Sequence, residues 1–149
     1  MSRGFVKDDD DRPEIPPPRP VSDRPNYVTA HGLDLLREAA ERARASGDKR
    51  NAEYYDERVG TAEVVDPLVA EPGVIAFGRT VTGRDESTGT RVHLRIVGED
   101  EADPAHGTIS WISPYASALI GHRAGDRVVV QRPAGPATVV IETVEIDPS

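Results

Sequence analysis

The sequence lacks cysteine, and this absence excludes several kinds of chemistry. None of its 149 residues is a cysteine, so disulfide bonds, thiolate nucleophiles and cysteine-ligated zinc sites are ruled out. Long hydrophobic runs are also missing, because no stretch approaches the ~20 apolar residues that a membrane span needs. The N-terminus turns acidic at once and shows no export signal. We therefore expect a cytoplasmic protein with no membrane partner.

Positive charge and aromatic side chains are scarce as well. The net charge is −8, which repels a phosphate backbone and disfavours broad duplex DNA binding, although a local basic patch stays open. One Trp, four Tyr and two Phe are few for a surface that stacks single-stranded bases. The four histidines show no metal-ligand spacing, so we expect no metal site and no cofactor. The acidity suits a basic protein surface or a metal ion, but it is also common among soluble proteins.

What is present begins with a polar arm over residues 1–26. Four aspartates, 8–11, are followed by the proline-rich stretch PEIPPPRP. Such a segment buries too little apolar surface to offset the entropy of ordering it. We expect a disordered or polyproline-II arm that serves either as a plain tail or as a ligand for a proline-binding partner.

Residues 27–66 have the pattern of an antiparallel helical hairpin. Thr29 is a good N-cap, Gly47 a good helix end, and Asp48 a good N-cap for a second helix. Apolar residues recur at spacings of 3, 4 and 3 in both halves: Leu33, Leu36, Ala40 and Ala43, then Ala52, Tyr55, Val59 and Ala62. Each arm spans only ~20–25 Å at the helical rise. A hairpin this short is marginal alone and needs a second unit to pack against.

Residues 67–149 change to a β pattern with one helix. A proline after Asp66 disfavours further helix. Strands are expected over 74–77 with 80–82, then 92–96, 109–112, 128–130 and 139–141, with a turn at 85–89. Ser113 and Pro114 are typical of a helix start, and Gly121 of its end. The fold class is therefore α+β, a short helical hairpin followed by a small mixed sheet.

Three stretches carry a resemblance to a known family. Asn26–Thr29 with Gly32-Leu33 is the first, and Gly47-Asp48 with Asn51–Tyr54 is the second. The third and most specific is the series IVG, EAD, ISW, SP and GD between residues 96 and 126. Together they resemble the GreA/GreB transcription elongation factors, and Trp111 with 27–29 and 64–67 favours the GreB branch.

The resemblance implies both a fold and a task. The fold is an N-terminal coiled coil carried by a C-terminal domain that is FKBP-like. The implied partner is the RNA polymerase core, whose secondary channel the coiled coil enters, bringing acidic tip residues near the catalytic magnesium. The polymerase itself then cleaves a backtracked transcript, which the factor touches only indirectly. Hard carboxylate oxygens are suitable ligands for such a magnesium ion.

The tip departs from the family pattern in charge and in length. Asp48 matches the first tip carboxylate and Glu53 matches a later acidic position, but Arg50 stands where an acidic residue precedes Asn-Ala. A cation there repels a metal ion. The family's hairpin is about twice as long, so this one loses on the order of 20 Å of reach at the helical rise. The sequence thus predicts a monomeric polymerase-binding factor, not itself an enzyme, with impaired cleavage stimulation.

Each candidate site residue also has a structural interpretation. Capping alone would account for Asp48, and formation of the tip turn alone would account for Gly47, Asn51 and Tyr54. Polymerase contact is the alternative to a plain helix start for four residues: Ile112, Ser113, Pro114 and Tyr115.

Three functional alternatives stay open beside cleavage stimulation. The chain can be a non-cleaving regulator that competes with longer Gre factors. It can be a peptidyl-prolyl isomerase, although its β part has few aromatic residues to line an apolar pocket. It can also be an adaptor that acts through its N-terminal arm.

Overall fold

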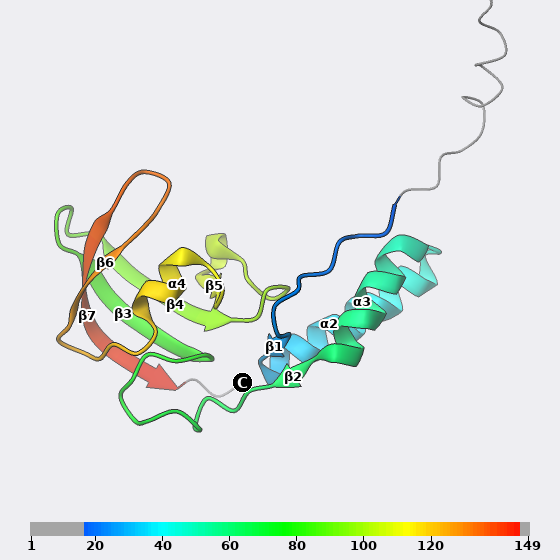
Figure 1. The fold of residues 1–149 in the computed structure, drawn as a ribbon, viewed down its shortest axis with the longest axis horizontal. Helices are drawn as coiled ribbons and strands as arrows, with labels where there is room; N and C mark the ends of the chain where they lie inside the picture. Colours follow the sequence, from blue (N-terminus) through cyan, green and yellow to red (C-terminus); the bar gives the residue numbers. More distant parts are fainter. Residues whose placement is uncertain (1–16, 147–149) are drawn as a thin grey trace, which may run out of the picture.

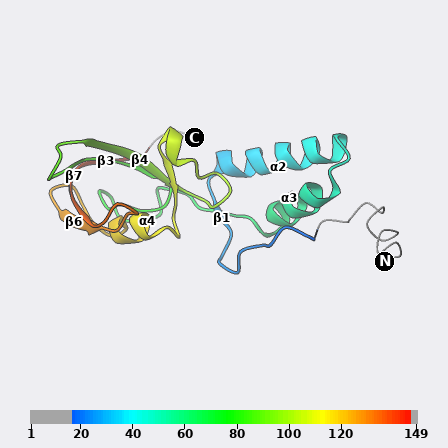
Figure 2. The same cartoon turned by 90° about the horizontal axis from the view of Figure 1, so that it is seen from above.

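The structure, a computed structural model, describes residues 17–146 and consists of two units joined at one root (Figure 1). The helical unit projects from the sheet-rich unit, and its tip is the part farthest from the sheet in both views (Figures 1 and 2). None of the helices within 17–146 has the length and apolar character to cross a membrane. The first 16 residues of the arm, with the four aspartates, lie outside the described residues.

Two helices form the projecting unit, and their ends follow the predicted caps. Helix α2 covers Ala30–Ala45, and the Thr29 hydroxyl accepts a bond from the backbone N–H of Gly32 at 2.8 Å. Helix α3 covers Lys49–Thr61 and begins at the cap Asp48. Between them Gly47 has φ +75°, a left-handed conformation that favours glycine. Caps and turn are thus confirmed, because each end satisfies backbone groups that the helix leaves free.

The two predicted apolar stripes differ in depth. In α2, Leu36, Ala40 and Ala43 are buried and Leu33 is half-buried. The stripe of α3, from Ala52 to Val59, is only half-buried along its length. The one buried residue of α3 is Arg58, so this helix depends on polar contacts for its placement.

A short parallel pair of strands forms the root of the hairpin, and the sequence did not predict it. Strand β1, Tyr27–Val28, pairs with β2, Glu63–Val64. The side-chain amide of Asn26 donates to the carbonyl oxygen of Arg58 at 2.7 Å. Both ends of the hairpin are therefore tied together where it meets the rest of the molecule.

A five-stranded mixed sheet forms the second unit. Its strands are β3 Arg79–Asp85, β4 Arg91–Val97, β5 Thr108–Ser110, β6 Arg127–Val130 and β7 Ala137–Ile146. They lie in the order β5-β4-β3-β7-β6. Only the β4–β5 pair is parallel, and it is separated by the 3₁₀ turn Pro104–His106. The predicted return strand, final hairpin and mixed character are all confirmed.

The predicted strand over 74–77 is wrong. Val74 makes a single bridge to Arg123, and the chain turns at Phe77 and Gly78 before β3 begins. Gly78 has φ +85°, and its N–H bonds to the carbonyl of Ile96. The buried Arg79 explains the local path, because its guanidinium donates to four backbone carbonyls. Those acceptors are Pro67, Ala70, Glu71 and Val74.

The apolar core lies between this sheet and helix α4, Pro114–Leu119. Residues from six segments are buried in it: Ile75, Val81, Ile96, Ala116, Leu119, Val128, Val130, Ala137, Val139 and Ile141. The Ser113 hydroxyl accepts from the N–H of Ala116, and Pro114 takes the first helical position, as predicted. The core therefore belongs to the sheet unit, and the hairpin makes no contribution to it.

Candidate functional site

The tip of the hairpin is closed by a cap. Asp48 Oδ1 accepts a hydrogen bond from the backbone N–H of Asn51 at 3.1 Å. Its Oδ2 accepts from the side-chain amide of Asn51 at 2.6 Å. These two bonds, the backbone one first, hold the pKa of Asp48 below its ordinary value. The capping role of Asp48 is confirmed, and both of its oxygens are engaged inside the hairpin.

The other charged residues at the tip do not gather into a ligand set. Glu53 is exposed on the next turn of α3. Among residues 17–146, no three His, Cys, Asp or Glu side chains come together as a metal ion would require. A shallow hollow of about 490 Å³ lies beside the tip, lined by Ala43, Arg44, Gly47, Asp48, Lys49, Ala52, Glu53 and Asp56. The magnesium-proximal role of Asp48 and Glu53 stays a prediction.

The described part of the N-terminal arm, residues 17–26, runs along the hairpin towards its tip (Figure 1). Arg50 donates from Nε to the carbonyl oxygen of Pro17 at 2.7 Å. Arg19 donates from Nη1 to Oδ1 of Asn51 at 2.9 Å, and its guanidinium lies 3.8 Å from the centre of the Tyr54 ring. This part of the arm therefore differs from the free tail that its composition suggests.

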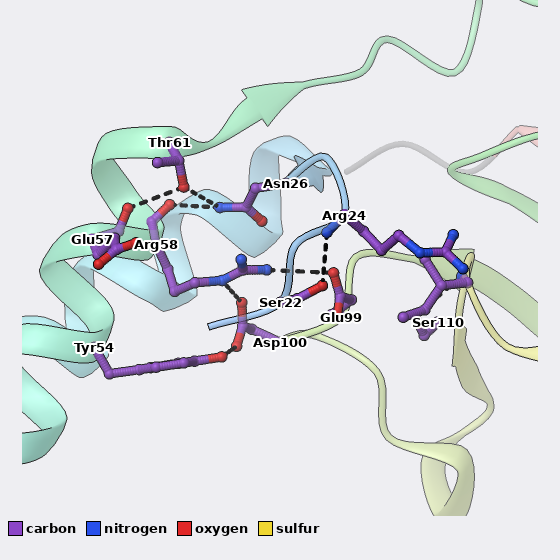
Figure 3. A network of polar contacts seen from close by, with 11 residues as sticks. Ser22, Arg24, Asn26, Tyr54, Glu57, Arg58, Thr61, Glu99, Asp100 and Ser110 are labelled. Atoms are coloured by element: carbon purple, nitrogen blue, oxygen red, sulfur yellow. Dashed lines mark hydrogen bonds and ion pairs between the residues drawn. The ribbon is translucent and has the colours of Figure 1, made fainter. Parts of the chain in front are cut away.

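A polar network fixes the hairpin to the sheet unit (Figure 3). Arg58 is 1% exposed, and its Nε donates to Asp100 Oδ2 at 2.7 Å. Its Nη2 lies 3.8 Å from Glu99 Oε2. The Tyr54 hydroxyl donates to the other oxygen of Asp100. Burial, followed by this contact with Asp100, raises the pKa of Tyr54 to about 12.

A third acidic residue in the same loop contacts the start of α2. The Thr29 hydroxyl, which caps this helix, donates to Glu101 Oε1 at 2.5 Å. Two glycines permit the close approach: a Cβ at Gly32 would collide with the Glu101 carboxylate, and one at Gly98 would collide with the Tyr27 carbonyl. Residues 98–101, directly after β4, thus contact the base of both helices.

The predicted polymerase-facing loop lies at the start of α4. Pro114 is exposed, whereas Ile112, Ser113 and Tyr115 are half-buried. Burial raises the pKa of Tyr115. An exposed Ile112 would have favoured a contact surface, and the structure does not provide it. The helix-start role of Ser113 and Pro114 is confirmed, and their polymerase contact stays a prediction.

The structure brings the tip residues Gly47, Asp48 and Asn51 together at one end of the molecule. It places the loop 112–115 on the sheet unit, away from that end (Figure 1). The sequence candidates therefore form two separate surfaces, one on a narrow projection and one on the body that carries it.

The sheet unit is what the comparison with known families recognises. Residues 70–146 match the family described as "Transcription elongation factor, GreA/GreB, C-term". The chain belongs to the GreA/GreB family.

Individual GreA/GreB proteins extend the similarity into the hairpin. The transcription elongation factor GreA of Alkalilimnicola ehrlichii is 42% identical over an aligned length of 116 residues, and the match covers 66% of this chain and 73% of that protein. GreA of Anaeromyxobacter sp. is 39% identical over 127 residues, covering 74% of this chain and 76% of the relative. Both relatives are GreA proteins, and nothing distinguishes the GreB branch, which stays a prediction.

Solved structures of the GreA/GreB family also match the chain. The GreA/GreB factor of Nitrosomonas europaea is 26% identical, with a TM-score of 0.45 over 80% of this chain and 98% of that one. The GreA factor homolog Gfh1 of Thermus thermophilus is 21% identical, with the same TM-score over 82% of this chain and 99% of that one.

Sequence reasoning missed the contacts at the root of this GreA/GreB chain. Arg58 and Asp100 drew no attention because neither falls on an apolar stripe. A signal was present, since Tyr54, Arg58 and Thr61 follow at spacings of 4 and 3 and so share one face of α3. Three consecutive acidic residues, 99–101, follow a strand after a single glycine and offer partners for such a face.

Proposed function

We propose that the chain is a transcription elongation factor that binds the RNA polymerase core at its secondary channel. The observation that carries this proposal is the match of residues 70–146, the whole sheet unit, to the GreA/GreB C-terminal family. The relatives with 42% and 39% identity are named transcription elongation factors. The factor works in the cytoplasm as a monomer and is not itself an enzyme.

The sheet unit supplies the docking surface in this proposal. The loop 112–115 is the segment through which it contacts polymerase. Pro114 is exposed at the start of α4, and the Ser113 cap fixes the turn beneath it. A rigid exposed proline next to half-buried apolar side chains is suited to a partner surface, because little conformational entropy is lost on docking.

The hairpin enters the channel in this proposal but stimulates transcript cleavage poorly. Helix α2 has 16 residues and is about 24 Å long at 1.5 Å per residue. Both oxygens of Asp48 already accept bonds from Asn51. Arg50, the residue before Asn51, is cationic and repels a metal ion. The chain then acts as a regulator that competes with longer Gre factors, and any magnesium belongs to the polymerase.

Binding to purified core polymerase tests the docking surface. In Pro114→Glu, the new glutamate is favourable in the first turn of a helix, so α4 should still form. The substitution places a negative charge on the proposed contact. We expect at least tenfold weaker binding than wild type. Pro133→Glu, on an exposed turn between β6 and β7, is the matched control and should bind normally. Absence of polymerase binding by the wild-type chain at micromolar concentration would contradict the proposal.

Cleavage of a backtracked transcript tests the role of the tip. We expect little stimulation by the wild-type chain and inhibition of a full-length GreA added with it. Arg50→Glu restores an acidic residue before Asn51 without lengthening the hairpin. If reach is limiting, this variant stays inactive. Strong cleavage by Arg50→Glu would show that charge, and not length, limits the wild-type chain.

A further inference from the structure

The surface of α3 next to the tip is occupied by an arginine from the same chain. Arg19 lies with its guanidinium 3.8 Å from the centre of the Tyr54 ring and 5.4 Å from that of Tyr55. The two rings meet edge to face, with centroids 5.2 Å apart. Arg19 also donates to Asn51 Oδ1 at 2.9 Å. An aromatic face beside an acceptor oxygen is a favourable site for a planar guanidinium.

The arm is attached here by few contacts. Arg19 is half-buried, whereas its neighbours Pro17, Pro18 and Pro20 are exposed. Within the described part of the arm, this end also has a bond from Arg50 Nε to the Pro17 carbonyl oxygen, and a hydrogen bond between Arg19 and Tyr55 raises the pKa of Arg19. At the opposite end, Asn26 is buried and bonded to the hairpin root. The arm, residues 17–26, is therefore anchored at Asn26 and held near the tip chiefly by the Arg19 side chain, which a competing ligand can displace. We call this segment the strap.

We propose that Asn51, Tyr54 and Tyr55 form an arginine-binding surface, that Arg19 fills it within the same chain, and that an arginine of the polymerase takes its place when the hairpin is inserted. The final step rests on the proposed polymerase-binding function. The first two steps do not depend on it.

The positions of these residues give the strap a regulatory effect. Asn51 lies in the first turn of α3, beside the tip, and Tyr54 lies about one turn farther along, where its hydroxyl bonds Asp100. A docked arm therefore covers a face of α3 that begins at the tip. A partner that needs this surface binds only molecules whose arm has opened, and its apparent affinity falls by the open fraction. A cation–π contact together with a hydrogen bond, the kinds of interaction that hold Arg19, corresponds to a closed-to-open ratio of about 5 to 30.

A spin label tests the contact within the chain. The sequence has no cysteine, so Val21→Cys, at an exposed arm position, carries a single nitroxide in the full-length protein. We expect paramagnetic broadening of the α3 amides from Asn51 to Tyr55. Adding Arg19→Ala should abolish it. Adding Arg24→Ala should leave it intact, because Arg24 also precedes a proline in the arm and only its backbone N–H bonds, to Ser22 Oγ.

Three results would overturn the internal contact. They are no broadening at 51–55 in the labelled wild type, broadening that survives Arg19→Ala, and broadening that grows with protein concentration. The last would mean that the arm contacts a second copy. A capped peptide, Pro-Pro-Arg-Pro-Val, at millimolar concentration should displace the arm, and its lysine analogue should do so less well. Equal displacement by both peptides would remove the selectivity for arginine.

Binding to core polymerase tests the exchange. Arg19→Ala should bind about 5- to 30-fold more tightly than wild type, and Arg24→Ala should match wild type. Unchanged or weaker binding by Arg19→Ala would refute the exchange. If no variant binds polymerase, the proposed function fails, while the spin-label result still decides whether the strap exists.

Discussion

The hairpin and the sheet unit of this molecule are stabilised by different kinds of contact. The sheet unit surrounds a cluster of apolar side chains in which Ile96, Val81 and Leu119 are 0% exposed. The hairpin joins that unit through an ion pair from Arg58 to Asp100 and a hydrogen bond from Thr29 to Glu101. Tyr27 at the root adds aromatic contacts, with its ring centroid 6.3 Å from that of Phe77 and 5.0 Å from that of Trp111. Burial of apolar area is insensitive to direction, whereas hydrogen bonds demand one geometry. The apolar core therefore stabilises the fold of the sheet unit, and the hydrogen bonds at the root set the orientation of the hairpin relative to it.

Two buried arginines, Arg58 and Arg79, bind different kinds of partner. Arg79 lies under the segment 67–74 and satisfies backbone carbonyls of that segment alone. Arg58 satisfies carboxylates that belong to the other unit. The first fixes a local path of the chain, and the second fixes the relative placement of two units. Substitutions should separate these effects.

Ile96→Ala should have the largest effect, because it removes buried apolar volume from the centre of the sheet unit. We expect a loss of about 4 kcal/mol in the free energy of unfolding. Urea unfolding followed by Trp111 fluorescence measures it. The milder Ile96→Val should cost about 1 kcal/mol. Equal effects of the two variants would mean that Ile96 does not occupy a tightly packed core.

Arg58→Met should release the hairpin and leave the sheet unit folded. The substitution keeps a long apolar stem but leaves Asp100 and Glu99, which are 14% and 18% exposed, without their cation. Breaking such a buried pair costs about 3 kcal/mol. Hydrogen exchange should speed up in α2 and α3, while the core strands keep their protection. Faster exchange throughout both units would show that they unfold as one and would contradict a separate role for the contacts at the root.

The sequence foretold local elements better than the contacts between them. The caps Thr29, Asp48 and Ser113 could be predicted because a cap is decided by a few neighbouring residues. The strand expected at 74–77 failed because a short apolar run has no period that separates a strand from an extended segment. Here Val74 makes a single bridge to Arg123, and the chain turns at Phe77 and Gly78. Local pattern shows a polar face on α3 and an acidic run at 99–101, but it does not show that Arg58 pairs with Asp100, 42 positions away.

The tip shows the same limit. The resemblance identified Asp48 and Asn51 as a motif, and cap chemistry explained the bond between them. Neither the resemblance nor the cap chemistry predicts that Arg19 packs on the Tyr54 ring. Proline-rich composition predicts an extended chain but not the surface that it contacts.

The contact between Tyr54 and Asp100 makes the stability of the hairpin depend on pH. The pKa of Tyr54 is raised to about 12, above the ordinary value of 10. The neutral phenol is therefore favoured in the folded state, and its contribution is complete below pH 10 and lost as the pH rises through 12. We expect hairpin protection to fall in that window in wild type. Tyr54→Phe lacks the hydroxyl bond to Asp100 at every pH and should show a smaller change.

Ultraviolet titration checks the assignment. The difference between the wild-type and Tyr54→Phe titration curves should contain one phenol with an apparent pKa near the value of about 12. A difference curve centred at the ordinary tyrosine value would mean that the Tyr54 hydroxyl is not held by Asp100. The effect on stability should be smaller than that of Arg58→Met, because Tyr54 is only half-buried.

Arg44→Ala should have the smallest effect, although its contact looks as close as any in the hairpin. Arg44 Nη1 lies 2.5 Å from Asp56 Oδ1 and joins α2 to α3, but both side chains are more than half exposed. Water and salt screen such a pair, so its loss should cost less than about 0.5 kcal/mol. The same hydrogen-exchange measurement gives the comparison with Arg58→Met. A loss as large as that of Arg58→Met would mean that the hairpin is held between its own arms, and not at its root, because an exposed bridge would then equal a buried one.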